Sequence, residues 1–164
     1  MKINFLTKIL TFKGMCMKSG LILLSLLAVL VIAQNAFCES IQWKNYNEGI
    51  RLSRKENKKV FLHFRTDWCG FCIKMEKTTF VDRKIIAFLN QHFISIKVDG
   101  DKETSLNRAY KVNGFPDNRF LNESRREVFK LPGFLDAMTF FFVLEYIHSN
   151  SYKTMTPMQY YKSR

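Results

Sequence analysis

The sequence feature that most constrains the fold is a pair of cysteines placed where an apolar run ends and a helical pattern begins. Residues 60–64 are almost continuously apolar, which predicts a buried central strand, and residues 69–80 follow with helical periodicity. This order puts Cys69 at the start of a helix, where backbone N–H groups and the helix dipole stabilise a thiolate. Because the thiolate is the attacking form of cysteine, we predict that Cys69 is a catalytic nucleophile.

Cys72 lies one helical turn after Cys69 and on the same face of the predicted helix. That spacing fits the Cα separation of about 4.4–6.8 Å that a disulfide requires. We expect Cys69 to form a mixed disulfide with a protein substrate and Cys72 to resolve it. The predicted chemistry is exchange between protein thiols and disulfides, with the Cys69–Cys72 disulfide as the redox-active group and no other cofactor.

Two other roles for the cysteine pair are less favoured. A tetrahedral zinc site needs four ligands, but the chain has no second CxxC and its three histidines are scattered, so we expect no metal. A permanent structural disulfide over so short a loop would constrain the unfolded chain only weakly.

The N-terminal segment, residues 1–38, resembles a secretory signal peptide. It carries four lysines and no acidic residue, and its apolar run 21–33 is shorter than the roughly 20 residues that span a bilayer. Small residues at Ala36 and Cys38 predict cleavage before residue 39. We therefore expect an exported protein, in the periplasm or another extracytoplasmic compartment, whose domain is 39–164. An uncleaved membrane anchor and acylation of Cys38 are the alternatives.

The chain has a formal net charge of +12. Its basic residues form no dense cluster in the sequence, so we expect a solvated basic surface and no nucleic-acid binding. We also expect a monomer.

The order of predicted elements indicates an α/β fold with a mixed central β-sheet flanked by helices on both faces. Helices are predicted at 43–56, 69–80, from 82 onward, 103–110, 135–148 and after Thr156-Pro157, with strands at 60–64, 93–98, 119–121 and 127–131. The last two strands are joined by a short polar turn, which predicts an antiparallel hairpin.

Four stretches of this chain resemble the thioredoxin-like superfamily, in particular its small exported members. They are Lys59-Val-Phe-Leu-His-Phe64, Asp67-Trp-Cys-Gly-Phe-Cys72, Val112-Asn-Gly-Phe-Pro116 and Leu131-Pro-Gly-Phe134. The resemblance implies a thioredoxin fold with a core at about 43–148 and a short C-terminal helical tail. It also implies an enzyme of cell redox homeostasis.

The resemblance further implies a binding groove for an extended substrate peptide. Pro116 would be a cis-proline lying against the cysteine pair, and the backbone of Phe115 would pair with the substrate. Trp68, Gly70 and Phe71 would border this groove together with Phe115. Alternatively, Trp68 and Phe115 could be core aromatics.

The sequence departs from the family pattern at three places. His63 stands six residues before Cys69, at a position where thioredoxins have a buried acid. Because the reference pKa of histidine is about 6.5, His63 could transfer a proton when Cys72 resolves the mixed disulfide. Alternatively, it could be an ordinary hydrogen-bonded core residue. Gly70-Phe71 replaces the Gly-Pro of thioredoxins, so the redox potential cannot be transferred. Residues 117–119 are polar, and we expect a ragged or edge-exposed strand start there.

The resemblance to reductive family members favours a reductase or isomerase over an oxidase. Such an enzyme would receive electrons from a membrane or exported donor. The competing hypothesis is a non-catalytic binding module on the same fold, either a copper-handling protein that uses both cysteines and one histidine, or a peptide-binding chaperone.

Overall fold

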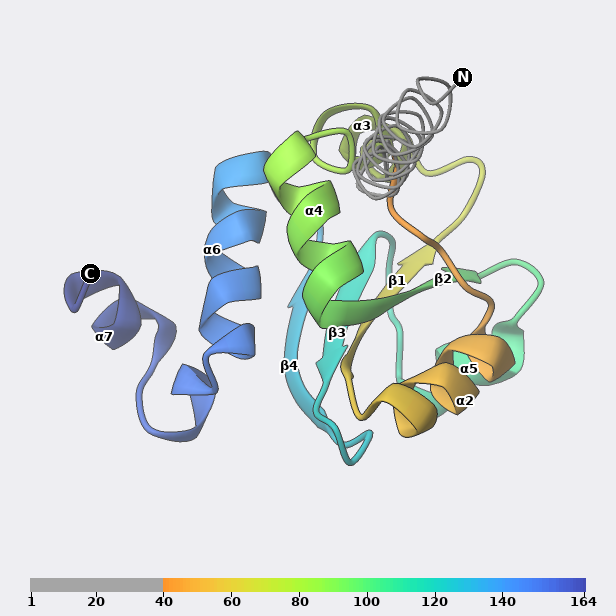
Figure 1. Cartoon of the computed structure of the whole chain (residues 1–164). Coiled ribbons are helices and arrows are strands. Elements are labelled where there is room, and N and C mark those ends of the chain that lie inside the picture. Colours follow the sequence, from red (N-terminus) through yellow and green to blue (C-terminus); the bar gives the residue numbers. More distant parts are fainter. Residues whose placement is uncertain (1–39) are drawn as a thin grey trace, which may run out of the picture. The chain divides into compact units, whose positions relative to one another are not determined.

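The computed structural model describes residues 40–164, which fold around a four-stranded mixed sheet (Figure 1). The strand order is β2-β1-β3-β4; β1 runs parallel to β2 and antiparallel to β3, and β3 runs antiparallel to β4. The strands are β1 (Lys59–Arg65), β2 (Phe93–Asp99), β3 (Asp117–Leu121) and β4 (Glu127–Pro132). The helices are α2 (Tyr46–Glu56), α3 (Gly70–Thr78), α4 (Arg83–His92), α5 (Thr104–Ala109), α6 (Ala137–His148) and α7 (Pro157–Lys162), with a 3-10 turn at Ser151–Lys153. The predicted signal segment, residues 1–38, lies outside the described residues.

Helices cover both faces of the sheet, as predicted (Figure 1). Successive side chains of a strand point to opposite faces, so β1 contributes to two cores. Phe61 packs with residues of α3, α4 and α6, whereas Leu62 and Phe64 pack with residues of α2 and α5. The same alternation places His63 on the side of the sheet that α3 covers.

Side-chain caps fix several helix starts. Asp82 accepts hydrogen bonds from the first turn of α4, and Thr156 forms a capping box at the start of α7, which confirms both predicted starts. Helix α2 begins later than predicted because Asn45 caps it by accepting the Glu48 N–H at 2.9 Å. Trp43 therefore lies before this helix.

The expected ragged start at residues 117–119 is wrong. β3 lies between β1 and β4, and all five of its residues are buried. The Arg119 guanidinium donates to the Asp117 carboxylate at 2.7 and 2.8 Å and to Glu127 at 2.8 Å. These partners satisfy the buried polar groups, and the hydrogen bond with Asp117 is the main cause that raises the pKa of Arg119.

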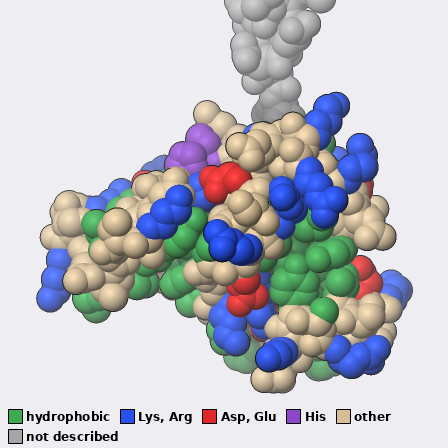
Figure 2. Space-filling view, turned by 90° about the horizontal axis from the view of Figure 1, so that it is seen from below, with side chains coloured by type: hydrophobic (Ala, Val, Ile, Leu, Met, Phe, Trp, Pro, Cys, Tyr) green, Lys and Arg blue, Asp and Glu red, His purple; other side chains and the backbone are tan. Residues whose placement is uncertain are grey.

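None of the helices in residues 40–164 has the length and apolar character needed to cross a bilayer. Figure 2 shows one face of this domain, on which Lys and Arg side chains are spread among acidic and apolar ones. The positive charge of this face is therefore dispersed.

Candidate active site

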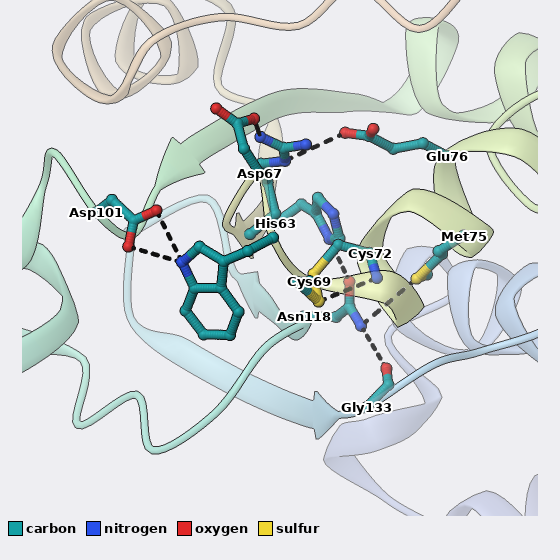
Figure 3. Close-up of a disulfide and its surroundings, with 11 residues drawn as sticks. His63, Asp67, Cys69, Cys72, Met75, Glu76, Asp101, Asn118 and Gly133 are labelled. Atoms are coloured by element: carbon teal, nitrogen blue, oxygen red, sulfur yellow. Dashed lines mark hydrogen bonds and ion pairs between the residues drawn. A yellow bond between two sulfur atoms is a disulfide. The ribbon is translucent and has the colours of Figure 1, made fainter.

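Cys69 and Cys72 form a disulfide at the start of α3, with their Cα atoms 5.2 Å apart (Figure 3). Cys69 is the N-cap residue of this helix, and its Sγ accepts the backbone N–H of Cys72 at 3.1 Å. Gly70, the first residue of the helix, is exposed. Cys69 retains 5 % exposure while Cys72 has none, so Cys69 is the more accessible residue of the pair.

The peptide bond between Phe115 and Pro116 is cis and directly precedes β3. Because β3 pairs with β1, whose end leads into the cysteine pair, this bond lies beside the segment that carries Cys69. The Pro116 carbonyl accepts the Gly133 N–H at 2.7 Å. Within residues 40–164, Phe115 makes no backbone hydrogen bond, so its N–H and C=O can pair with an added strand.

The Phe115 ring occupies space that a glycine leaves open. A Cβ placed on Gly100 would lie 2.3 Å from Cζ and 2.5 Å from Cε1 of Phe115, and 3.2 Å from Cγ2 of Thr66. Gly100 follows β2, so this contact joins the end of that strand to the loop before Pro116. The missing side chain at position 100 thus helps to fix Phe115.

Exposed aromatic rings border the cysteine pair. Trp68 is 71 % exposed and Phe71 is 62 % exposed, which excludes the alternative that Trp68 is a core aromatic. Trp68 lies edge-on to Phe115 with ring centroids 6.0 Å apart, and its Nε1 donates to both Asp101 oxygens at 3.1 and 3.2 Å. The ring centroids of Phe71 and Phe134 are 6.4 Å apart. The rim therefore offers apolar surface to an unfolded or extended segment.

His63 is fully buried on the sheet beneath α3, and its Nδ1 lies 2.8 Å from Oδ1 of Asn118 (Figure 3). Burial lowers the pKa of His63 to about 4; the Asn118 hydrogen bond opposes this effect, and nearby Lys97 adds to it. The imidazole is therefore neutral near pH 7. A role of His63 in proton transfer stays a prediction.

A small group of charges borders His63. Glu76 of α3 accepts a hydrogen bond from Lys97 Nζ at 2.9 Å and lies 3.5 Å from Arg65 Nε. Arg65 also pairs with Asp67, just before Trp68. These pairs tie α3 to β1 and β2 beside the disulfide.

No three His, Cys, Asp or Glu side chains of residues 40–164 are grouped so that they could hold a metal ion.

Sequence reasoning missed the contributions of Asn118 and Gly100. Asn118 meets His63 only because β3 pairs with β1 in a register that sets the two residues opposite each other. Gly100 marked the end of a strand, but its contact with Phe115 depends on how the loop before Pro116 folds back. Neither contact leaves a local signal in the sequence.

Comparison with known proteins identifies thioredoxin-like relatives. A family model described as a thioredoxin-like domain matches residues 46–148. The disulfide bond reductase DsbH of Chlamydia pneumoniae is 27 % identical over 104 residues, which cover 56 % of this chain and 63 % of that protein, less than two thirds of its length. Thioredoxin-1 of Drosophila melanogaster is 32 % identical over 76 residues, covering 46 % of this chain and 68 % of that protein. The solution structure of a thioredoxin from Thermus thermophilus matches with a TM-score of 0.61 and 25 % identity, over 66 % of this chain and 87 % of that one.

Proposed function

The chain belongs to the thioredoxin-like family, and from this premise we propose that it is an exported enzyme that reduces or isomerises disulfides of protein substrates. Its relatives and its CxxC disulfide make it a protein thiol–disulfide oxidoreductase. Export and the net direction of electron flow are proposed in addition. The observation that supports the exchange activity most directly is the disulfide at the start of α3, set beside the cis Phe115–Pro116 bond and an exposed aromatic rim.

In the dithiol form, the Cys69 thiolate attacks one sulfur of a substrate disulfide. A bond forms between that sulfur and Cys69 Sγ, and the second substrate sulfur leaves with the electron pair. Cys72 then attacks Cys69 Sγ, the mixed disulfide breaks, and the substrate is released with both sulfurs reduced. The Cys72 N–H, which points at Cys69 Sγ, stabilises the thiolate in the first step.

Substrate docking is proposed to use the backbone of Phe115. An extended peptide that pairs with its free N–H and C=O would add a strand beside Pro116, with its disulfide facing Cys69. Apolar side chains of that peptide would lie against Trp68 and Phe71, whose rings are already exposed to solvent.

Direction and location are proposed from the relatives and the leader. The relative DsbH is named a disulfide bond reductase, which supports electron flow toward substrates. Segment 1–38 supports export to the periplasm or an equivalent compartment, where a membrane or exported donor would re-reduce the Cys69–Cys72 pair. We propose a monomer whose redox group is this disulfide alone, with His63 taking part in proton transfer.

The reduction potential of the cysteine pair against glutathione tests the proposed direction. A value between about −180 and −270 mV, the range from protein disulfide isomerase to thioredoxin, is expected. A value near −120 mV, that of a strong oxidant, contradicts the proposal.

Variants of the two cysteines test the chemistry with a peptide disulfide as substrate. Cys72→Ser should accumulate a mixed disulfide that reductant releases, whereas Cys69→Ser should form none. A protein that binds the peptide equally well when both cysteines are serine, and that reduces no disulfide when both are present, is a chaperone and not this enzyme.

A further inference from the structure

Two loops flank the cysteine pair from opposite sides. Strands β1, β2 and β4 run in the same direction, because β1 is parallel to β2 and both β1 and β4 are antiparallel to β3. They end at the same edge of the sheet, where β3 begins. In the strand order β2-β1-β3-β4, the loops after β2 and β4 are the outer ones, and the cysteine pair, which follows β1, lies between them. Figure 3 shows Asp101 of the first loop and Gly133 of the second on opposite sides of the disulfide.

The side of the loop after β2 carries an excess of negative charge. Its charged residues are the acids Asp67, Asp99, Asp101 and Glu103 and the cations Arg65 and Lys102. Asp67 pairs with Arg65, and Asp99 pairs with Lys102 at 2.7 Å. Within residues 40–164 no cation pairs with Asp101, which is exposed and accepts the Trp68 Nε1–H at 3.1 and 3.2 Å. The Trp68 end of the aromatic rim is therefore bordered by an unpaired negative charge.

The side of the loop after β4 carries a lysine. Nζ of Lys74, an exposed residue of α3, lies 4.7 Å from the centroid of the Phe134 ring, within the roughly 6 Å of a cation–π contact. The Phe134 ring also lies near that of Phe71, so this contact holds the ammonium group at the border of the aromatic rim. In the described part of the chain, Lys74 forms no ion pair.

The acid that follows Phe134 does not neutralise this lysine. Asp136 caps α6, and its carboxylate accepts the Thr139 N–H at 2.9 Å and the Thr139 hydroxyl at 3.0 Å. These hydrogen bonds, above all the one from the backbone, lower the pKa of Asp136, and the positive end of the α6 dipole offsets its charge. The groove around the disulfide thus has a negative end beside Trp68 and a positive end beside Phe71.

We propose that Asp101 and Lys74 are specificity-determining residues, which select protein segments whose disulfide cysteine has a cationic side chain on one side and an anionic side chain on the other. The cationic side chain lies beside Asp101 and packs on Trp68. The anionic side chain lies beside Lys74 and packs on Phe71. This inference rests on the proposed exchange activity and deepens it by naming the class of substrate.

Each of the two residues also has an ordinary role that requires no charge on a substrate. Asp101 can serve only to hold Trp68, and Lys74 can serve only to pack on Phe134. Those roles predict that the order of charges along a bound peptide has no effect on its reaction rate. Electrostatic complementarity predicts a clear effect, because like charges placed together repel and opposite charges attract.

The test uses three peptides of equal length, each with one cysteine joined by a disulfide to a small uncharged fluorescent thiol. The first peptide has lysine before the cysteine and glutamate after it, the second has these two residues exchanged, and the third has serine at both positions. The second-order rate constant for release of the fluorescent thiol by the reduced enzyme is measured at low ionic strength. Because the two charged peptides have the same composition and net charge, they differ only in how their charges meet the two ends of the groove.

We expect one charged peptide to react faster than the serine peptide and the other to react more slowly. An exposed ion pair changes an affinity by up to about fivefold, so two such pairs should separate the charged peptides by at least about threefold. The difference should disappear in about 0.5 M salt, which screens exposed charges.

Variants of the two ends assign the effect to its residues. Lys74→Glu combined with Asp101→Asn should invert the preference, because the negative charge then lies beside Phe71; Asp101→Asn keeps an acceptor for Trp68 Nε1. Lys74→Arg, which keeps the charge and the cation–π contact, should keep the preference. Lys77→Glu, at an exposed position one turn further along α3, is the matched control, because it changes the net charge as Lys74→Glu does and should leave the preference intact.

The outcomes separate this inference from the proposed function. Equal rate constants for the two charged peptides in the wild type overturn the inference alone. A preference that the double variant leaves unchanged, or that Lys77→Glu inverts, also overturns it, because the selection then comes from other charges. Failure of the wild type to reduce any of the three peptides overturns the proposed function, and the inference with it.

Discussion

Replacing Gly100 by alanine should displace Phe115 from its position beside Pro116. The added Cβ would lie 2.3 Å from the Phe115 ring, while carbon atoms in contact are separated by about 3.5–4.0 Å. The ring therefore has to retreat by about 1 Å or more. Backbone strain does not contribute, because Gly100 is not in a positive-φ conformation.

The effect of Gly100→Ala on the free energy of unfolding has two contributions. Overpacking of this kind destabilises a fold by about 1–3 kcal/mol. A Gly→Ala change at a compatible position stabilises it by about 0.4–1 kcal/mol through the unfolded chain. Gly114→Ala isolates the second term, because nothing lies within 4 Å of a Cβ at this exposed position next to Phe115. The two variants should differ by about 1–3 kcal/mol in unfolding free energy.

Activity should follow the same displacement. Because the Phe115 backbone is the proposed docking edge, Gly100→Ala should raise the KM for a peptide disulfide by about tenfold, equivalent to 1.4 kcal/mol of binding. The rate of Cys69 alkylation in the reduced protein should stay at its wild-type value, since the helix start is untouched. Urea unfolding and steady-state peptide reduction measure the two effects.

A second substitution makes the test specific. Phe115→Leu in the Gly100→Ala background shortens the clashing side chain and should recover most of the lost stability. Equal stability and equal KM for Gly100→Ala and Gly114→Ala would refute the argument that this glycine positions Phe115.

Three further predictions address the rim, the buried charges and the pH dependence. Trp68→Ala should change the unfolding free energy by no more than about 0.5 kcal/mol, because the ring is exposed, but it should raise the KM for the peptide. Asp101→Asn, which keeps an acceptor for Trp68 Nε1, is the control. An unchanged KM in Trp68→Ala would contradict a role of the aromatic rim in peptide binding. Arg119→Met should destabilise the fold by about 3–5 kcal/mol in urea unfolding, because it leaves the buried Asp117 carboxylate unpaired, and a loss below 1 kcal/mol would contradict this. The His63 pKa is about 4 in the folded state and about 6.5 unfolded, so the unfolded chain binds the extra proton between these values and stability falls as pH drops through that window, by about 3 kcal/mol in total. The stability difference between wild type and His63→Gln should therefore shift by this amount from pH 7 to 4, and a pH-independent difference would exclude it.

Much of the fold follows from local patterns in the sequence. The almost continuous apolar run of β1 predicted a strand buried on both faces, and the Asp82 and Thr156 caps mark helix starts by their own hydrogen bonds. These features depend on neighbours within a few residues, which the sequence displays directly. The start of β3 was misjudged because the partners of Arg119 are fixed by strand pairing and by a hairpin, which local polarity does not reveal.

The reactive cysteine pair was evident in the sequence, because a CxxC motif at a strand-to-helix junction places the first cysteine at the helix start and the second within the distance that a disulfide requires. The state of His63 was decided by tertiary structure alone. Its pKa depends on complete burial, and its hydrogen-bond partner is an amide 55 residues away that also contacts two carbonyl groups of the following strand and turn. Spacing along the chain can specify local geometry, but solvation and long-range hydrogen bonds exist only after the sheet has assembled around the residue.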